Sequence, residues 1–270
     1  MSCLRDLLRE GRLPALEARM LLQEVLHVSR SWLIAHDDEA LSEEQLRAYR
    51  GLENRRLAGE PMAYILGRRE FMGHEFRVTP AVLIPRPETE LLVEKAVSLI
   101  QEHPDSRVLD LGTGSGAIAI SIALACSRAR VVATDYSAEA LEVARSNAQA
   151  LGARVEFHQG SWYEALPEGK VFDLIVSNPP YIPMGDPHLA EGDLRFEPDI
   201  ALTDGNDGLD AYRQIIAGAV RHLEPGGSLY VEHGLGQETA VCALLTKAGF
   251  QAVHSLPDLA GILRVSGGHF

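Results

Sequence analysis

The sequence predicts an α/β protein, in which a mostly parallel, doubly wound sheet with a reversed strand at one edge follows a small helical domain. From residue 107 onward, short apolar runs alternate with stretches of helical periodicity, as parallel strands and crossover helices do. A glycine-rich turn follows the first of these runs. The last two runs are joined without a helix between them, which favours an antiparallel pair. With 270 residues, 46% of them hydrophobic, the chain can bury a sizeable core.

The first part of the chain, residues 1–70, has the pattern of a helical bundle. Apolar residues recur at helical spacing over 2–10 and 14–28. A further helix begins at Ser42, which is a favourable cap, with Gln45 at the capping-box position. Such a domain either buries a face of the larger domain or docks a macromolecular substrate, and the sequence leaves both roles open.

Residues 71–86 are expected to form a connector, with two short strands around a glycine that resemble a hairpin. The larger domain then covers 87–270 and begins with a helix. Arg86, Glu88 and Glu90 lie together ahead of this helix. The acids are best explained as favouring the helix amino terminus, and the role of Arg86 stays open.

The alternation of elements in the larger domain is regular. Strands are expected at 108–111, 131–134, 155–157, 171–176, 228–231, 251–254 and 262–265. Helices are expected at 115–126, 137–150, 208–223 and 237–248. The stretch 182–205 breaks the pattern, since it has no periodicity and carries six acids against one base. A structureless loop of this length is usually functional or mobile, so we expect a lid that faces the substrate.

The charge and cysteine content exclude several classes of protein. The formal charge is −13, and residues 74–270 carry 14 Lys and Arg against 26 Asp and Glu, so broad binding to nucleic acid is not expected. No apolar run could span a bilayer, and the amino terminus lacks a secretory signal. The three cysteines without CxxC spacing and the ten histidines without paired spacing predict neither disulfides nor a metal. We expect a cytoplasmic protein.

A cofactor site is predicted at the glycine-rich turn. Gly112, Gly114 and Gly116 follow a strand and open a helix, where backbone N–H groups can approach a ligand. The GxGxG spacing differs from the GxGxxG of dinucleotide binders. Asp135 ends the next strand, where a carboxylate can accept both ribose hydroxyls, and Asp110 could face an ammonium group. S-adenosylmethionine, a nucleoside that carries an amino acid, fits this pair of carboxylates.

Two members of this predicted site have equally good structural explanations. Asp135 alone could cap the helix that starts near Ser137. Trp162 follows the third strand, where it could cover an adenine ring or be an ordinary, partly buried aromatic residue.

The sequence Asn178-Pro179-Pro180-Tyr181 follows a buried strand, at the sheet edge where open α/β proteins carry their chemistry. Neither proline has an N–H group, and both hold the chain extended, which leaves several acceptors with few donors. Such a corner suits a planar NH2 group, with the Tyr181 ring against its face. The alternative for the corner alone is an ordinary proline turn at the end of a strand.

Five segments carry a family resemblance and read LIPRPETE, DLGTGSGAIAI, ATDYSAEALEVARSNA, FDLIVSNPPYIP and RFEPDIALTDGNDGLDAYR. Together they resemble the HemK/PrmC-type family, the glutamine methyltransferases that act on peptide chain release factors. The resemblance implies a class I (Rossmann-like) methyltransferase fold, a helical domain that docks the release factor, and a monomer. It also implies an S-adenosylmethionine site, with S-adenosylhomocysteine as product, made by Asp110, Gly112, Thr113, Gly114, Ser115, Gly116, Asp135, Trp162 and Asn178.

For the substrate, the resemblance implies the glutamine of a Gly-Gly-Gln loop, held by Asn178, Pro179, Pro180 and Tyr181. The Asn178 side-chain oxygen and the Pro179 carbonyl would accept the amide hydrogens, and Tyr181 would pack on the flat amide. The alternatives are a glutamine methyltransferase acting on a ribosomal protein and an adenine amino-methyltransferase acting on nucleic acid. The acidic charge disfavours the second. A non-catalytic cofactor-binding protein would have no need of the acceptor corner.

Overall fold

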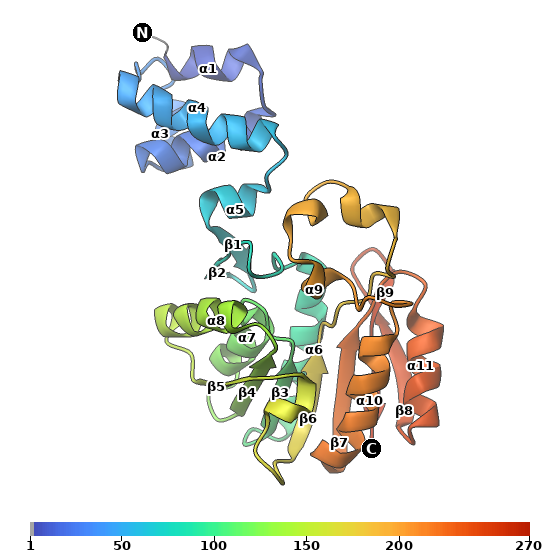
Figure 1. Ribbon diagram of the computed structural model, residues 1–270. Helices are drawn as coiled ribbons and strands as arrows, with labels where there is room; N and C mark the ends of the chain where they lie inside the picture. Colours follow the sequence, from blue (N-terminus) through green and yellow to red (C-terminus); the bar gives the residue numbers. More distant parts are fainter. Residues whose placement is uncertain (1–2) are drawn as a thin grey trace. The chain divides into compact units, whose positions relative to one another are not determined.

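The computed structural model describes residues 3–270, which form two compact units, one up to Gly67 and one over Arg68–Phe270. Residue 2, the first of the helix expected over 2–10, lies outside the described residues. Figure 1 shows a helical first unit and a second unit built around a sheet. No helix within residues 3–270 is both long and apolar enough to cross a membrane.

The first unit contains five helices in its described part. They are α1 (Leu4–Glu10), α2 (Ala15–Leu26), α3 (Arg30–Ala35), α4 (Glu43–Leu57) and α5 (Met62–Leu66). Leu21, Leu22 and Tyr49 lie in their common core. The capping box is present, because Ser42 Oγ accepts from Gln45 N at 3.2 Å and Gln45 Oε1 accepts from Ser42 N at 2.9 Å. The sequence did not predict α3 and α5, since so few residues show little helical periodicity.

The second unit begins with a hairpin of β1 (Arg68–Phe71) and β2 (His74–Arg77). Met72 and Gly73 form its two-residue turn with φ of 52° and 75°, as a tight hairpin requires. The expected boundary at residue 70 therefore falls inside β1. The helical segment ends earlier because Gly67, with φ of 71°, stops α5 in a left-handed conformation.

A seven-stranded sheet forms the centre of the second unit, with the strand order β5-β4-β3-β6-β7-β9-β8. The strands are β3 (Arg107–Leu111), β4 (Arg130–Asp135), β5 (Val155–Gln159), β6 (Phe172–Ser177), β7 (Leu223–Glu232), β8 (Gln251–Pro257) and β9 (Leu263–His269). Strands β3 to β7 are parallel, and β9 runs antiparallel to both β7 and β8. The predicted fold class is thereby confirmed, and the reversed strand belongs to the directly joined pair at one side of the sheet.

Helices cover both faces of this sheet (Figure 1). They are α6 (Glu90–Glu102), α7 (Ala117–Ala125), α8 (Ala138–Leu151), α10 (Asp210–His222) and α11 (Glu238–Lys247). Alternate strand residues point into two cores, because successive side chains of a strand face opposite sides. Val108 packs in the core with α6 and α7, whereas Leu109 packs in the core with α10 and α11. The carboxyl ends of the strands stay open between these layers for a site.

Asn147, on α8, fastens the hairpin to the glycine-rich turn. It is buried, its Nδ2 donates to Ser115 O at 2.9 Å and to Arg77 O at 3.0 Å, and its Oδ1 accepts from Arg77 N at 2.8 Å. One side chain thus satisfies three backbone groups from two separate segments.

We expect Asn147→Ala to destabilise the second unit by about 2–4 kcal/mol, because these backbone groups lose their partners. Denaturant unfolding followed by Trp162 fluorescence in a Trp32→Phe background would measure this unit alone, since the chain has two tryptophans. Gln149→Ala, at an exposed position of the same helix, is the control and should change stability by less than about 0.5 kcal/mol. Equal effects of the two variants would contradict this role of Asn147.

Candidate active site at the carboxyl ends of the strands

Strand register brings the two predicted motifs together. Leu111, the last residue of β3, is paired with Ser177, the last residue of β6, although 66 residues separate them. Ser177 Oγ donates to Leu111 O at 2.7 Å. The glycine turn and the proline corner therefore leave the sheet side by side, at the edge where open α/β sheets bind ligands.

Two adjoining cavities occupy this edge and share Gly112, Asp135 and Ile200 in their walls. The larger, of about 300 Å³, is also lined by Trp162 and Pro180. The smaller, of about 90 Å³, is lined by further predicted site residues, namely Thr113, Gly114, Ser115 and Asn178. The structure thus gathers most of the predicted cofactor residues around one space.

The three glycines of the turn are needed for different structural reasons. Gly112, Gly114 and Gly116 have φ of 72°, 55° and 83°, which side chains rarely tolerate. A Cβ at Gly116 would lie 2.7 Å from Ile120 Cδ1, so this glycine permits close packing inside the protein. A Cβ at Gly112 would lie 3.5 Å from the Trp162 ring, and one at Gly114 would meet only open space. The first two glycines therefore leave room for a ligand.

Asp135 joins the turn to the next helix. Its Oδ2 accepts from Gly114 N at 2.8 Å and its Oδ1 accepts from Ser137 N at 2.9 Å. Ser137 Oγ itself caps α8 by accepting from Ala140 N at 3.1 Å. Burial raises the pKa of Asp135, and the two backbone N–H groups partly offset that rise. Asp135 is therefore not the cap of the helix, and its carboxylate lines both cavities.

Asp110 differs from the expectation that it faces the ligand directly. It is fully buried and belongs to neither cavity wall. Its Oδ2 accepts from Thr113 Oγ1 at 2.6 Å and from Ala119 N at 3.2 Å, and its Oδ1 has no protein partner among the described residues. Burial raises the pKa of this carboxyl to about 7. Asp110 thus supports the turn from behind and keeps one acceptor unused.

Trp162 has an unusual backbone for a bulky residue, with φ of 45°. It begins a short helical turn, η2 (Trp162–Ala165), that follows β5. Gly160, two residues earlier in the chain, lets η2 pack closely against the backbone, because a Cβ at Gly160 would lie 3.0 Å from Ala165. Trp162 lies beside Gly112, and both residues line the larger cavity.

The acceptor corner is held by residues that sequence reasoning missed. Asn178 Nδ2 donates to Thr89 Oγ1 at 3.2 Å. Gln237 Nε2 donates to Tyr181 O at 3.0 Å. A Cβ at Gly208 would lie 2.5 Å from that same carbonyl oxygen, so only glycine fits there. Burial raises the pKa of Tyr181 to about 12, so its phenol stays neutral. No local sequence pattern distinguishes these supporting residues.

The stretch 182–205 is not structureless as predicted. It contains three short helical segments, η3 (Pro187–Ala190), η4 (Leu194–Phe196) and α9 (Asp199–Leu202). Ile200, on α9, lies in the walls of both cavities. Ile182 N donates to Leu202 O at 3.0 Å, which closes the stretch into a compact loop beside the corner. Its turns are too short to show helical periodicity in the sequence.

Arg86 has a clear role in the structure. It forms an ion pair with Glu197 of this loop, whose side chain is buried. Glu197 Oε2 also accepts from Ile84 N at 2.9 Å. Burial raises the pKa of Glu197, and Arg86 opposes that rise. The pair therefore connects the loop to the segment ahead of α6. A second acid, Glu90, accepts a hydrogen bond from Met72 N at 2.7 Å and so connects α6 to the hairpin.

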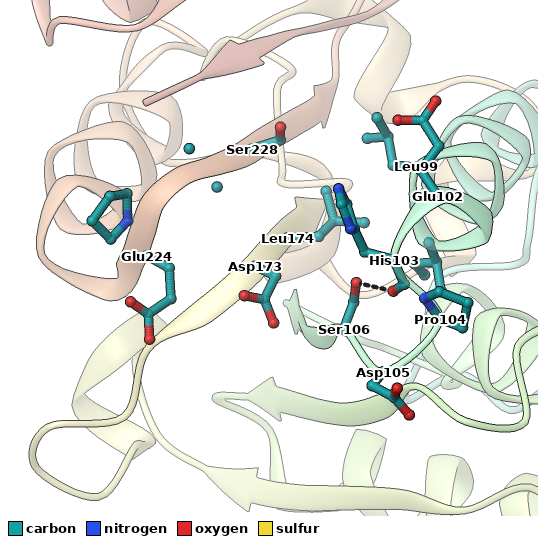
Figure 2. Close-up of a pocket in the computed structure, with 14 residues that line it drawn as sticks. Leu99, Glu102, His103, Pro104, Asp105, Ser106, Asp173, Leu174, Glu224 and Ser228 are labelled. Carbon is teal, nitrogen blue, oxygen red and sulfur yellow. Dashed lines mark hydrogen bonds between the residues drawn. The ribbon is translucent and has the colours of Figure 1, made fainter.

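A separate cavity of about 680 Å³ lies at the opposite edge of the sheet, where β3, β6 and β7 begin. Figure 2 shows Asp173 and Glu224 beside it, and Ser106 bonded to the carbonyl of His103. Arg107 Nη2 lies 3.1 Å from Asp173 Oδ1 and 2.8 Å from Glu224 Oε1. These acids are thus paired with one guanidinium, and the candidate site remains at the carboxyl edge.

Comparisons with known proteins identify the family. The PrmC N-terminal domain family matches residues 2–67, and a methyltransferase domain family matches residues 102–253. The release factor glutamine methyltransferase of Bordetella pertussis is 60% identical, with 100% of both chains covered. That of Burkholderia pseudomallei is 54% identical over 97% of this chain and 94% of the relative.

Among solved structures, a methyltransferase from Pyrococcus furiosus has a TM-score of 0.56 at 20% identity and covers 82% of this chain and 98% of its own. A 16S rRNA N2 G1207 methyltransferase of T. thermophilus, in complex with AdoMet and guanosine, has a TM-score of 0.54 at 25% identity. It covers 75% of this chain and 49% of its own. The chain belongs to the release factor glutamine methyltransferase family, whose methyltransferase domain carries the site described above.

Proposed function

We propose that this protein transfers a methyl group from S-adenosylmethionine to the side-chain amide nitrogen of the Gly-Gly-Gln glutamine in a peptide chain release factor, a reaction of the cytoplasm. The observation that carries the proposal is the meeting of a glycine turn and a donor-poor corner at one sheet edge. The names of the relatives, release factor glutamine methyltransferase, support the choice of substrate.

The residues present fit S-adenosylmethionine. Its ribose hydroxyls are donors that suit the Asp135 carboxylate in the cavity wall, and its adenine suits the Trp162 ring. Its ammonium group needs a carboxylate, and Asp110, which lies behind the turn and outside the cavity walls, has one oxygen, Oδ1, without a protein partner among the described residues. When bound, it supplies a methyl group on a sulfonium, which already has a good leaving group.

The corner would act by positioning the acceptor amide. An amide nitrogen is a weak nucleophile, because its lone pair is delocalised into the carbonyl. Asn178 Oδ1 and the Pro179 carbonyl would accept the two amide hydrogens, which orients the nitrogen and stabilises the positive charge that develops on it. Tyr181 would pack on the flat amide, and the loop held by Arg86 and Glu197 would limit access of water.

We further propose that the helical unit docks the release factor. Leu16 and Ile34 are large apolar side chains with 59% and 64% of their surface exposed. Exposed apolar residues on a small helical unit suit contact with a protein partner.

Mass spectrometry of a release factor incubated with the protein and S-adenosylmethionine tests the proposed reaction. We expect one added methyl group, located on the Gly-Gly-Gln glutamine, and none without the cofactor. Methyl transfer to a ribosomal-protein glutamine or to adenine in nucleic acid, offered in parallel, would instead support one of the alternative substrates.

The Asn178 side chain gives the sharpest mutational prediction. Asn178→Ala should lower kcat by about 10²–10³-fold, since it removes one preorganised acceptor of the transition state. The affinity for S-adenosylhomocysteine, measured by calorimetry, should change by less than the activity. Turnover within a fewfold of the wild-type value would remove Asn178 from the mechanism.

The raised pKa of Asp110 leads us to expect that cofactor binding depends on pH. Its raised pKa of about 7 means that the carboxyl is mostly protonated at pH 6 in the free protein. A bound ammonium group favours the charged form of Asp110, so cofactor binding at pH 6 should release a proton. The affinity for the cofactor should therefore increase with pH up to about 7 and then level off. Calorimetry with S-adenosylhomocysteine in buffers of different ionisation enthalpy measures this release. Asp110→Asn should abolish it, and unchanged proton release in that variant would contradict the assignment.

A further inference from the structure

The chemistry of the corner depends on which end of the Asn178 amide faces the substrate. The oxygen and the NH2 group of an asparagine have nearly the same shape, so a hydrogen bond must select one orientation. A substrate NH2 group needs the oxygen. In the structure, Nδ2 of Asn178 donates to Thr89 Oγ1 at 3.2 Å, which directs Oδ1 the other way.

Thr89 can hold this orientation only if its own proton points elsewhere. A hydroxyl both donates and accepts, so a Thr89 proton aimed at Asn178 would favour the opposite orientation of the amide. Thr89 ends η1 (Pro87–Thr89), directly before α6, and is 4% exposed, so water cannot readily take the proton. A buried acceptor beside Thr89 is therefore required.

Glu232 is the buried acid placed to serve as this acceptor. It is the last residue of β7 and is 3% exposed. In the parallel pairing of β6 with β7, Ser177 lies opposite Val231, so Asn178 and Glu232 leave neighbouring strands at the same level. Thr89 and Asn178 lie near enough to the Glu232 carboxyl to stabilise its charged form by hydrogen bonding. Its Oε2 has no hydrogen-bond partner among the described residues and is therefore free to accept one.

We propose that Glu232 and Thr89 are positioning residues for methyl transfer: the Glu232 carboxylate accepts a hydrogen bond from the Thr89 hydroxyl, and Thr89 Oγ1, which accepts from Asn178 Nδ2, thereby holds the Asn178 oxygen toward the substrate amide. The inference rests on the proposed function, because only a substrate that brings an NH2 group needs this orientation. It assigns a purpose to a buried acid that does not itself contact the reacting atoms.

The surroundings of Glu232 make this arrangement sensitive to pH. Burial is the main influence and raises the pKa of its carboxyl to about 7. Arg264 of β9 and the hydrogen bonds described above lower the pKa, and Glu88 of η1 raises it. The phenols of Tyr181 and Tyr212 also face this acid, and Tyr212 donates to the Glu232 backbone oxygen at 3.0 Å. When Glu232 is protonated it becomes a donor, so the ordering of Thr89 is lost as pH falls through this range.

The test compares isosteric and conservative variants. Thr89→Val keeps the shape but removes the hydroxyl, and should lower kcat by about tenfold, the equivalent of one hydrogen bond. Its affinity for S-adenosylhomocysteine and its unfolding midpoint should stay near wild type. Thr89→Ser restores the hydroxyl and should recover most of kcat. Glu232→Gln cannot titrate, so the acidic limb of the kcat profile near pH 7 should disappear.

A double variant shows whether Thr89 and Glu232 act together on Asn178 or affect activity independently. Thr89→Val combined with Glu232→Gln should lose less kcat than the two single losses combined, since Glu232 acts on Asn178 largely through Thr89. Additive losses, wild-type kcat in Thr89→Val, or no recovery in Thr89→Ser would each overturn the proposal.

A readout without turnover keeps this test distinct from that of the proposed function. The side-chain NH2 resonances of Asn178 should titrate near pH 7 in the wild-type protein and should not titrate in Glu232→Gln. If the chemical shifts of the Asn178 NH2 group in the wild-type protein do not change with pH, the positioning role is overturned even when the enzyme methylates release factor. A protein that shows the titration but methylates no release factor would instead refute the proposed substrate.

Discussion

The parallel pairing of β3 with β6 is the constraint on which the site depends. Leu111 lies opposite Ser177, and the Ser177 hydroxyl bonds to the Leu111 carbonyl. A slip of one residue would turn every side chain of a strand to the other face. Both cores of the second unit fix this register, since alternate residues of each strand are buried on opposite sides. The position of the glycine turn beside the acceptor corner is thus a product of core packing.

Much of the fold could be predicted because its signals are local. Long apolar or periodic stretches identified all seven strands of the sheet and its main covering helices. Boundaries shifted where one residue decides them, as at Gly67, whose left-handed conformation ends α5. The turns within 182–205 were missed because their stability comes from contacts such as Arg86 with Glu197, which are distant in sequence.

The candidate site could be predicted only where its functional residues are adjacent in the sequence. The glycine turn and the proline corner are such cases, and the structure brings them together. The supporting residues Asn147, Glu197 and Glu232 have no local signature, because each contacts a segment far away in the chain. Asp110 is fully buried behind the turn, which no local pattern could predict. Side-chain direction and burial are properties of the assembled core.

The scarcity of donors at the proline corner has a consequence for amino-acid selectivity. A glutamate at the same position would bring two anionic oxygens toward the Asn178 oxygen and the Pro179 carbonyl, with no hydrogen to share. Dipoles of like orientation would repel it, and its charge would remain unsolvated beside the buried corner. Under the proposed function, the corner would therefore distinguish a carboxamide from its deamidated form, and a chemically aged substrate would be refused at the binding step.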